Sequence, residues 1–365
     1  MKIETYRGAP FVDREEEIEF FIDWFSDVPQ RILFVYGPKS SGKTTLIEYI
    51  IEKKLLTEKD WWIKSKYWIR YINLRRKLIS TYSTFLHSFI FPEDVYREKI
   101  ETNGKFSLKF FSIKRKILQE IERKERDLFE ELMRKIEEQS RGKICILIID
   151  EIQKLDEIYI NNNRELLKEF LNFCVSLTKE KHLSHVVILT PNTVFIEKIY
   201  NDAKLKKTSE FIKLDHLTKQ KVKEWLMIEG LSCNEQEMIW EYLGGCISDI
   251  LKVLAKKKRG ELKTLLERER WLAYTEIVDY LARGGFEDRE KKQFKEIAKE
   301  ILEKGYFEFR EDRYEYLPVI EKWAEREIFF YDPLELKITG NSKIYEKGME
   351  LLLEKRKETI QLIIK

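Results

Sequence analysis

Short apolar runs alternate with longer stretches of helical periodicity over the first 215 residues. Five runs have the length and the β-branched or aromatic content of buried strands, namely 31–36, 67–73, 144–149, 186–189 and 211–214. The stretches between them repeat apolar residues every three to four positions, as amphipathic helices do. Strands that alternate with helices predict an α/β core whose parallel sheet is covered on both faces.

The second half of the chain is mainly helical. Helical periodicity over 216–258, interrupted at 243–245 (LGG), predicts a small helical lid after the core. Two further helices, 262–281 and 291–303, precede an alternating segment, 306–317, that we interpret as a hairpin, and this order predicts a winged-helix domain. The predicted domains are the core 1–215, the lid 216–260, a winged-helix-like domain 261–335 and a helical extension 336–365.

The crossover between the second and third predicted strands is long. We expect one strongly charged helix over 113–138, with a solvated polar face. Before it, 105–110 (KFSLKF) alternates basic or polar residues with apolar ones. We interpret this segment as a half-buried strand, and a stacking surface for nucleic acid is the alternative.

Charge and cysteine content exclude some classes of protein. The 365 residues include 68 basic and 65 acidic ones, so a nucleic-acid partner needs a local patch and not a whole-chain field. The four cysteines show no CxxC spacing, which is typical of reduced thiols. No apolar run approaches the roughly 18 residues of a membrane span, and the chain starts without a signal-like segment. We therefore expect a cytoplasmic protein.

The first predicted strand runs into a glycine-rich loop. Residues 37–44 (GPKSSGKT) match the spacing GxxxxGK(S/T), and a helical pattern starts at Thr44. In such a loop, backbone N–H groups and a helix N-terminus face phosphate oxygens. The lysine, Lys43, neutralises the β- and γ-phosphates, and the hydroxyl of Thr44 binds Mg²⁺. The residues predicted to surround the nucleotide phosphates are Gly37, Pro38, Lys39, Ser40, Ser41, Gly42, Lys43, Thr44 and Thr45.

The third predicted strand ends in two acids, Asp150 and Glu151. The first carboxylate is placed to hold Mg²⁺, usually through water, and the second to polarise the attacking water. Small-molecule P-loop kinases and Ras-like GTPases typically lack this glutamate, and the guanine signature NKxD is absent. The pair therefore favours ATP hydrolysis, with Lys43 and Glu151 as catalytic residues, over phosphoryl transfer or GTP switching.

The fourth predicted strand leads into 190–193 (TPNT). We assign Thr190 first and Asn192 second as the polar residue that senses the γ-phosphate or orients the water, with a plain turn as the alternative. His182 and His185 flank this strand with HxxH spacing. Because no third metal ligand is near in sequence, we interpret them as loop histidines.

These motifs together resemble the archaeal ATPase family, a prokaryotic group close to the STAND and origin-recognition AAA+ ATPases. Residues 11–18 (FVDREEEI) resemble its FxGRExEL box and 150–155 (DEIQKL) its DEFQxL box. The segment 243–247 (LGGCI) resembles the lid signature GGxP, and 328–333 (IFFYDP) resembles a C-terminal segment of some members. The chain departs from these patterns at Asp13, in place of a glycine, and at Ile247, in place of the proline.

The resemblance covers nearly the whole chain and implies an additional-strand, AAA-like P-loop core, a helical lid and a winged-helix domain. By carry-over, Phe11, Val12 and Arg14 would line the adenine and ribose side of the nucleotide. Gly244 and Gly245 would shape the lid near the base. Most members of the family lack an assigned cellular role, so the resemblance implies chemistry and not physiology.

Three functions are compatible with this sequence. The first is an ATP-driven switch, the second a DNA-binding AAA+-type ATPase that processes or loads nucleic acid, and the third a non-catalytic scaffold, which Glu151 disfavours. A DNA-binding face would use Lys292 and Lys295 on the helix before the predicted hairpin and Arg313 on the wing, where interleaved glutamates weaken its field. A protein partner is the alternative, and the oligomeric state stays open.

The distribution of arginines bears on the rate of hydrolysis. The chain has no arginine between Arg164 and Arg259, where an arginine finger would be expected. Lys204, Lys206 and Lys207 are weaker substitutes because lysine is a flexible point charge. The sequence therefore predicts slow hydrolysis, below about one turnover per second.

Overall fold

The protein is described here from a computed structural model, which covers residues 4–6, 9–11, 14–56, 65–76, 78–93, 111–123, 125–156, 158–160, 164–191, 194–196, 203–257 and 260–364. Four of the sequence predictions fall outside these described parts: Val12, Asn192, the segment 105–110 and the side chain of Lys204.

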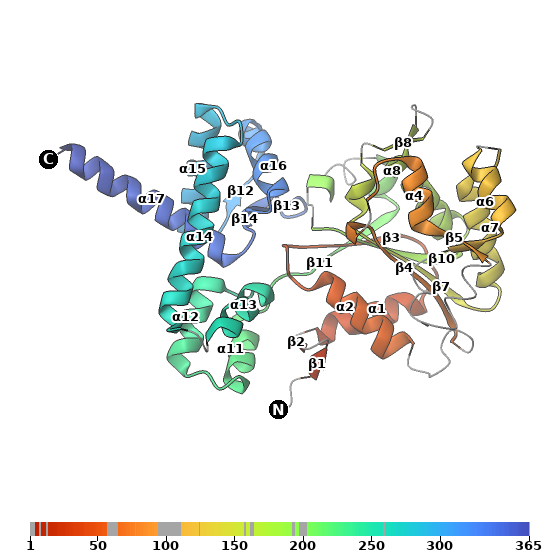
Figure 1. Ribbon diagram of the computed structural model, residues 1–365, viewed down its shortest axis with the longest axis horizontal. Coiled ribbons are helices and arrows are strands. Elements are labelled where there is room, and N and C mark those ends of the chain that lie inside the picture. Colours follow the sequence, from red (N-terminus) through yellow and green to blue (C-terminus); the bar gives the residue numbers. More distant parts are fainter. Residues whose placement is uncertain are drawn as a thin grey trace.

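A five-stranded parallel sheet forms the centre of the larger lobe (Figure 1). Its strands are β3 (Ile32–Tyr36), β4 (Tyr67–Asn73), β7 (Ile144–Asp150), β10 (Ser184–Leu189) and β11 (Ser209–Lys213). They lie in the order β11-β3-β10-β7-β4. Strand β10 therefore separates the strand before the glycine-rich loop from the strand that ends in the two acids. This order confirms the predicted additional-strand core.

The residues of these strands alternate between two hydrophobic layers because successive side chains point to opposite faces of a sheet. Ile32 and Phe34 belong to one buried cluster, and Leu33 and Val35 belong to the other. The helices that supply the rest of each layer are α1 (Glu15–Ser26) and α2 (Lys43–Ile50) on one face, with α4 (Tyr82–Phe89), α7 (Leu128–Ser140) and α8 (Leu166–Val175) on the other. Burial on both faces explains why β3, β7 and β10 are mostly apolar, whereas the edge strand β11 is half-buried and carries polar residues.

Shorter elements surround this core. They are β1 (Glu4–Tyr6), β2 (Ala9–Phe11), η1 (Ile51–Leu55), η2 (Leu74–Arg76), β5 (Ile90–Pro92), β6 (Phe111–Ile113), α6 (Arg115–Glu122), η4 (Ile152–Leu155), β8 (Tyr159–Ile160), β9 (Arg164–Glu165), η5 (Ser176–Glu180) and α10 (Ala203–Lys206). The single charged helix expected over 113–138 is wrong, because α6 and α7 are separate. Asp127 caps the second of them by accepting hydrogen bonds from the backbone N–H groups of Phe129 (2.7 Å) and Glu130 (3.1 Å).

The lid follows β11 and contains three helices, α11 (Lys219–Ile228), α12 (Cys233–Leu243) and α13 (Ile247–Lys257). They pack around Trp225, Leu226 and Ile239, which are at most 1% exposed. Glycines 244 and 245 separate α12 from α13, as the sequence pattern indicated. The long helix α14 (Leu262–Arg283) contributes Leu266 to this cluster and Ile277 to the next one. It therefore joins the lid to the winged-helix domain.

The winged-helix domain differs from the prediction in its hairpin. After α15 (Asp288–Lys304), strand β12 has only two residues (Phe307–Glu308), and η6 (Glu311–Tyr316) leads directly into α16 (Leu317–Glu325). The hairpin is instead β13 (Phe329–Asp332) with β14 (Lys337–Gly340), and β14 also pairs with β12. The predicted hairpin over 306–317 is therefore wrong, and so is the placement of Arg313 on a wing.

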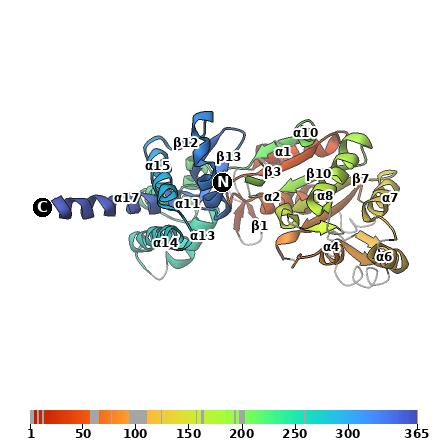
Figure 2. The same ribbon diagram turned by 90° about the horizontal axis from the view of Figure 1, so that it is seen from above.

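The position of the hairpin changes the assignment of the recognition helix and of the domain boundary. The helix directly before the hairpin, where winged-helix proteins place their recognition helix, is α16 and not the lysine-rich α15. The predicted boundary at 335/336 cuts the β13–β14 turn, so the domain continues at least to Gly340. The last helix, α17 (Lys343–Ile364), runs beside α14 and then projects from the molecule (Figures 1 and 2).

Candidate nucleotide site

The glycine-rich loop lies between β3 and α2 with the backbone shape of an anion-binding loop. Gly37 has a φ of 146°, and a Cβ there would stand 2.2 Å from the carbonyl oxygen of Leu214. Gly42 (φ 94°) caps α2, and Ser40 holds a φ of 63° that costs energy for a residue other than glycine. The predicted phosphate residues, from Gly37 to Thr45, thus form one continuous loop and first helical turn. Such a loop aims backbone N–H groups and a helix N-terminus at an anion.

The ammonium of Lys43 lies inside this loop. Its Nζ donates to the carbonyl oxygens of Gly37 (2.9 Å) and Pro38 (2.8 Å) and to the hydroxyl of Ser41 (3.3 Å). Burial lowers the pKa of Lys43 to about 8, against the opposing effect of the two acids at the end of β7. The lysine is 8% exposed, so its charge is held at the centre of the loop where phosphate oxygens can replace the carbonyls.

Asp150 lies directly beside Thr44. The threonine Oγ1 donates to Asp150 Oδ2 at 2.8 Å, and Nδ2 of Asn73 donates to the same oxygen at 2.8 Å. Burial raises the pKa of Asp150 to about 6. No group of three or more His, Cys, Asp or Glu side chains able to hold a metal occurs in the described part of the chain. A hydroxyl and one carboxylate fit Mg²⁺ that arrives with nucleotide phosphates and keeps several waters.

Glu151 follows in a left-handed conformation, with a φ of 65°. One carboxylate oxygen forms an ion pair with Arg75, and the other accepts a hydrogen bond from Nε2 of Gln153 at 2.6 Å. Thr190 is fully buried and donates to Oε1 of Gln153 at 3.1 Å. The predicted sensor Thr190 therefore reaches Glu151 through Gln153. No role was predicted for Asn73, Arg75 or Gln153, although Asn73 ends a predicted strand and Arg75 lies two residues beyond it.

A cavity of about 270 Å³ opens beside the loop on the side of α13. Phe11 and Arg14, both predicted on the base side, line it together with Gly42 and Thr45. Three lid residues complete the wall, namely Ile247, which departs from the lid signature, and Ser248 and Leu251, for which no role was predicted. The ring of Phe11 stacks on Tyr49 with centroids 4.0 Å apart. Apolar walls with a few polar groups are typical of a pocket that accepts an aromatic base.

Arg14 connects the phosphate loop with the segment between β11 and α11, where the lid begins. One nitrogen, Nη2, donates to the carbonyl oxygens of Ser41 (2.8 Å) and Asp215 (2.9 Å), while Nη1 pairs with Glu17 at 2.7 Å. The side chain is 8% exposed, so these contacts are shielded from water. Asp215 lies between β11 and α11, at the start of the lid. The same guanidinium nitrogen therefore connects the phosphate loop with the start of the lid.

Gly244 and Gly245, predicted to shape the lid near the base, lie between α12 and α13 and do not line the cavity beside the phosphate loop. A Cβ on Gly245 would lie 1.9 Å from the carbonyl oxygen of Leu217, whose N–H bonds to the Gly245 carbonyl at 3.1 Å. Both glycines line a different cavity, of about 770 Å³, together with His216 and Lys343. They precede Ile247 and Ser248, which do line the cavity beside the loop.

The winged-helix domain contacts the phosphate loop directly, which no sequence motif indicated. The backbone N–H of Lys39 donates to Asn341 Oδ1 at 3.0 Å, and the Lys39 ammonium pairs with Glu327. The hydroxyl of Tyr36 donates to Asp332 at 3.1 Å, and Lys213 pairs with the same carboxylate at 3.1 Å. The core and the winged-helix domain are therefore docked at the end of β3.

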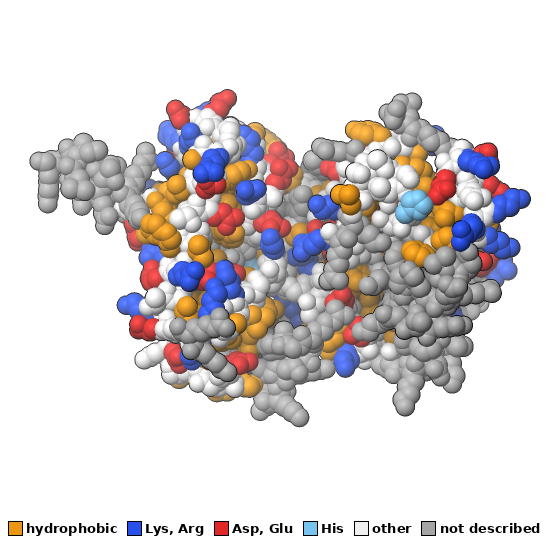
Figure 3. Space-filling view, viewed as in Figure 1, with side chains coloured by type: hydrophobic (Ala, Val, Ile, Leu, Met, Phe, Trp, Pro, Cys, Tyr) orange, Lys and Arg blue, Asp and Glu red, His pale blue; other side chains and the backbone are white. Residues whose placement is uncertain are grey.

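The predicted DNA-contact residues do not share one basic face. Arg313 pairs with Glu300 at 3.1 Å and donates to the carbonyl of Glu308 at 3.0 Å. Lys292 and Lys295 lie on α15, where Lys292 is 80% exposed with Glu296 at 3.8 Å. Figure 3 shows basic and acidic side chains interleaved over the visible face of this lobe. Helix α16 adds Glu321 and Glu325, so the helix in the recognition position is not basic.

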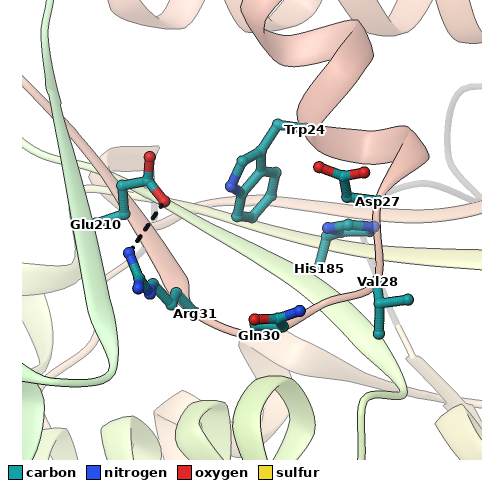
Figure 4. A pocket seen from close by; sticks show the side chains of 7 residues that line it. All are labelled: Trp24, Asp27, Val28, Gln30, Arg31, His185 and Glu210. Carbon is teal, nitrogen blue, oxygen red and sulfur yellow. Dashed lines mark ion pairs between the residues drawn. The ribbon is translucent and has the colours of Figure 1, made fainter.

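The HxxH histidines lie at the opposite edge of the sheet from the phosphate loop. His185 is the second residue of β10 and is buried against Trp24, so its interpretation as a loop histidine is wrong. It lines a cavity of about 400 Å³ at the amino ends of β3 and β10, together with Asp27 and an Arg31–Glu210 pair (Figure 4). His182 instead contacts the carbonyl of Pro29 at 2.6 Å. The two imidazoles have different environments.

Comparison with known proteins assigns the chain. Residues 11–253 match the family model of an ATPase domain predominantly from Archaea. An uncharacterized ATP-binding protein of Pyrococcus abyssi is 34% identical over 352 residues, which are 94% of this chain and 98% of that protein. An uncharacterized ATP-binding protein of Methanocaldococcus jannaschii is 33% identical over 311 residues, 79% of this chain and 82% of its own. This chain belongs to the archaeal ATPase family.

Among solved structures, this archaeal ATPase is similar to a Walker-type ATPase of Pyrococcus abyssi. The TM-score is 0.62 at 15% identity, over 96% of this chain and 99% of the other, so the likeness concerns the fold. The family match and the likeness of fold agree with the P-loop core described above. Within its described residues, no helix combines the length and apolar character needed to cross a membrane.

Proposed function

We propose that this archaeal ATPase binds ATP with Mg²⁺, hydrolyses it slowly, and acts as a nucleotide-dependent switch. The observation that carries the proposal is the meeting of three parts of the chain at one loop. The core supplies the phosphate loop, α13 supplies a wall of the base pocket, and the winged-helix domain contacts Lys39. A ligand that contacts all three changes the free energy of their arrangement.

In this proposal each residue of the site has one task. Lys43 and the backbone of the loop hold the phosphates, while Thr44 and Asp150 would hold the metal. The Mg²⁺ ion supplies electrostatic stabilisation of charge that develops on the phosphate oxygens. Glu151 orients the attacking water, and Thr190 positions Gln153 beside it.

The contacts of Glu151 support slow turnover. Each of its carboxylate oxygens already meets a donor, from Arg75 or from Gln153. A carboxylate that is paired on both oxygens is a poorer acceptor for a water proton. Together with the missing arginine near the fourth strand, this arrangement supports a basal rate below about one turnover per second. A switch tolerates such a rate, whereas a processive motor does not.

The alternative, a DNA-processing AAA+ ATPase, has a weaker basis. It requires a basic face, but the glutamates of α15 and α16 reduce the attraction for phosphates. Lys292 and Lys295 stay the predicted contacts if DNA is the partner. Free thiols at Cys145, Cys174 and Cys246, buried in the fold, suit a reducing cytoplasm, where we place the switch.

Phosphate release by the purified chain tests both proposals. We expect Mg²⁺-dependent turnover below about one per second, unchanged by duplex or single-stranded DNA. The mass of the particle in ATP and in ADP should be measured at the same time to detect assembly. Turnover of tens of ATP per second without a partner would contradict the switch, and a salt-sensitive stimulation by DNA would favour the alternative.

A further inference from the structure

The winged-helix domain contacts the phosphate loop through Glu327 and Asn341, two residues that are hydrogen-bonded to each other. Asn341 Nδ2 donates to the carbonyl of Glu327 at 2.7 Å, and the Asn341 backbone N–H donates to Ile328 at 2.9 Å. Asn341 is 5% exposed, so its side-chain oxygen is fixed toward the N–H of Lys39. These two residues therefore hold both the backbone and the ammonium of one loop residue.

Glu327 is held in an unfavourable backbone conformation. It joins α16 to β13 with a φ of 59°, a region that residues other than glycine rarely adopt. Its N–H donates to the carbonyl of Ala324 at 2.9 Å, which fixes the turn. A strained conformation persists only where its surroundings determine it. Here the turn presents a carboxylate to the phosphate loop.

The contact between Glu327 and Lys39 places opposite charges at the phosphate loop. Burial lowers the pKa of Lys43, and Glu327 opposes that effect after the larger contributions of Asp150 and Glu151. Lys39 occupies the third position of the loop and carries the ammonium that Glu327 engages. ATP brings a third phosphate and more negative charge than ADP. A carboxylate and a γ-phosphate therefore compete for one cation and repel each other.

We propose that Lys39 is the residue that distinguishes ATP from ADP, because Glu327 and the γ-phosphate compete for its ammonium. The docked winged-helix domain then favours ADP, and ATP releases it from the phosphate loop. This inference rests on the proposed switch and assigns its trigger to one ion pair. The contacts of Tyr36 and Lys213 with Asp332 involve no residue of the phosphate loop. They therefore stabilise the docked winged-helix domain equally with ATP and with ADP.

The first experiment measures affinity in the full chain with Glu151→Gln as the background, so that ATP persists. Calorimetry gives the dissociation constants of ATP and ADP with and without Glu327→Gln. Because the pair is partly exposed, with 50% and 33% of the two side chains accessible, we expect Glu327→Gln to shift the ratio toward ATP by about fivefold. Glu325→Gln is the matched control, since it removes the same charge from an exposed residue of the same turn. Lys39→Gln should shift the ratio in the opposite sense.

The second experiment follows docking by amide hydrogen exchange of the segment 327–341. In the Glu151→Gln background this segment should exchange faster with ATP than with ADP, and Glu327→Gln should remove the difference. Equal ATP-to-ADP ratios for the Glu327 and Glu325 variants would overturn the inference. If exchange still differed between nucleotides in that case, the switch would stand with another trigger. If neither ratio nor exchange responded to the nucleotide, the proposed switch itself would fail.

Discussion

The ion pair between Arg75 and Glu151 gives the sharpest test of the site. Arg75→Ala removes the donor on one oxygen of Glu151 and leaves Gln153 on the other. If the pair restrains the glutamate in a resting position, its removal should speed hydrolysis. The direction of the change therefore distinguishes a restraint from a catalytic cation.

The expected size of the rate change follows from the solvent exposure of the two side chains. The Arg75 side chain is 57% exposed and Glu151 is 9% exposed, so water and salt screen the pair from one side. Such pairs contribute about 0.5–1 kcal/mol, which corresponds to about a two- to fivefold change in rate. Higher ionic strength should reduce the difference between wild type and variant.

The assay is single-turnover release of the γ-phosphate with excess protein and Mg²⁺. Arg31→Ala is the control, because Arg31 is equally exposed at 58% and lies at the opposite edge of the sheet. Adding Glu151→Gln to Arg75→Ala should abolish the gain. A fall of tenfold or more in Arg75→Ala would refute the restraint, because it would mean that the guanidinium stabilises charge on the phosphates.

Three further predictions concern other parts of the molecule. Lys43→Ala should abolish nucleotide binding, whereas Glu151→Gln should bind ATP and stop turnover, and equilibrium binding with a phosphate assay separates them. Gly245→Ala should lower the melting temperature and weaken nucleotide binding, because its Cβ would lie 1.9 Å from a backbone oxygen of the hinge, while Gly142→Ala meets nothing within 4 Å and should change little. Burial lowers the pKa of His185 to about 4, so the unfolded chain binds this proton more readily. Stability should therefore fall by roughly 3 kcal/mol as pH drops from about 6.5 to 4, and His185→Leu should remove this part of a urea-unfolding pH profile.

The sequence by itself determined the parts of the site that depend on local order. The spacing from Gly37 to Thr44 and the strand that ends at Asp150 are short-range patterns, since a strand, a loop and a helix start are specified by neighbouring residues. Five apolar runs were enough to predict the five strands of the sheet, because a parallel sheet covered on both faces needs apolar strands, although the edge strand β11 is only half-buried. The local pattern failed at 306–317, where alternation over so few residues did not exclude a 3₁₀-helix that continues into α16.

Only the tertiary structure decided which distant residues meet at this site. Arg75 joins Glu151 across 76 positions because β4 and β7 are neighbours in register, and their ends lie at the same edge of the sheet. Asn341 reaches the N–H of Lys39 across 302 positions because an entire domain docks at that loop. Such pairs leave no periodicity or spacing in a single sequence, since they depend on strand order and domain packing. The phosphate loop of this archaeal ATPase is thus specified by neighbouring residues, whereas the contacts that other parts of the chain make with it depend on the tertiary fold.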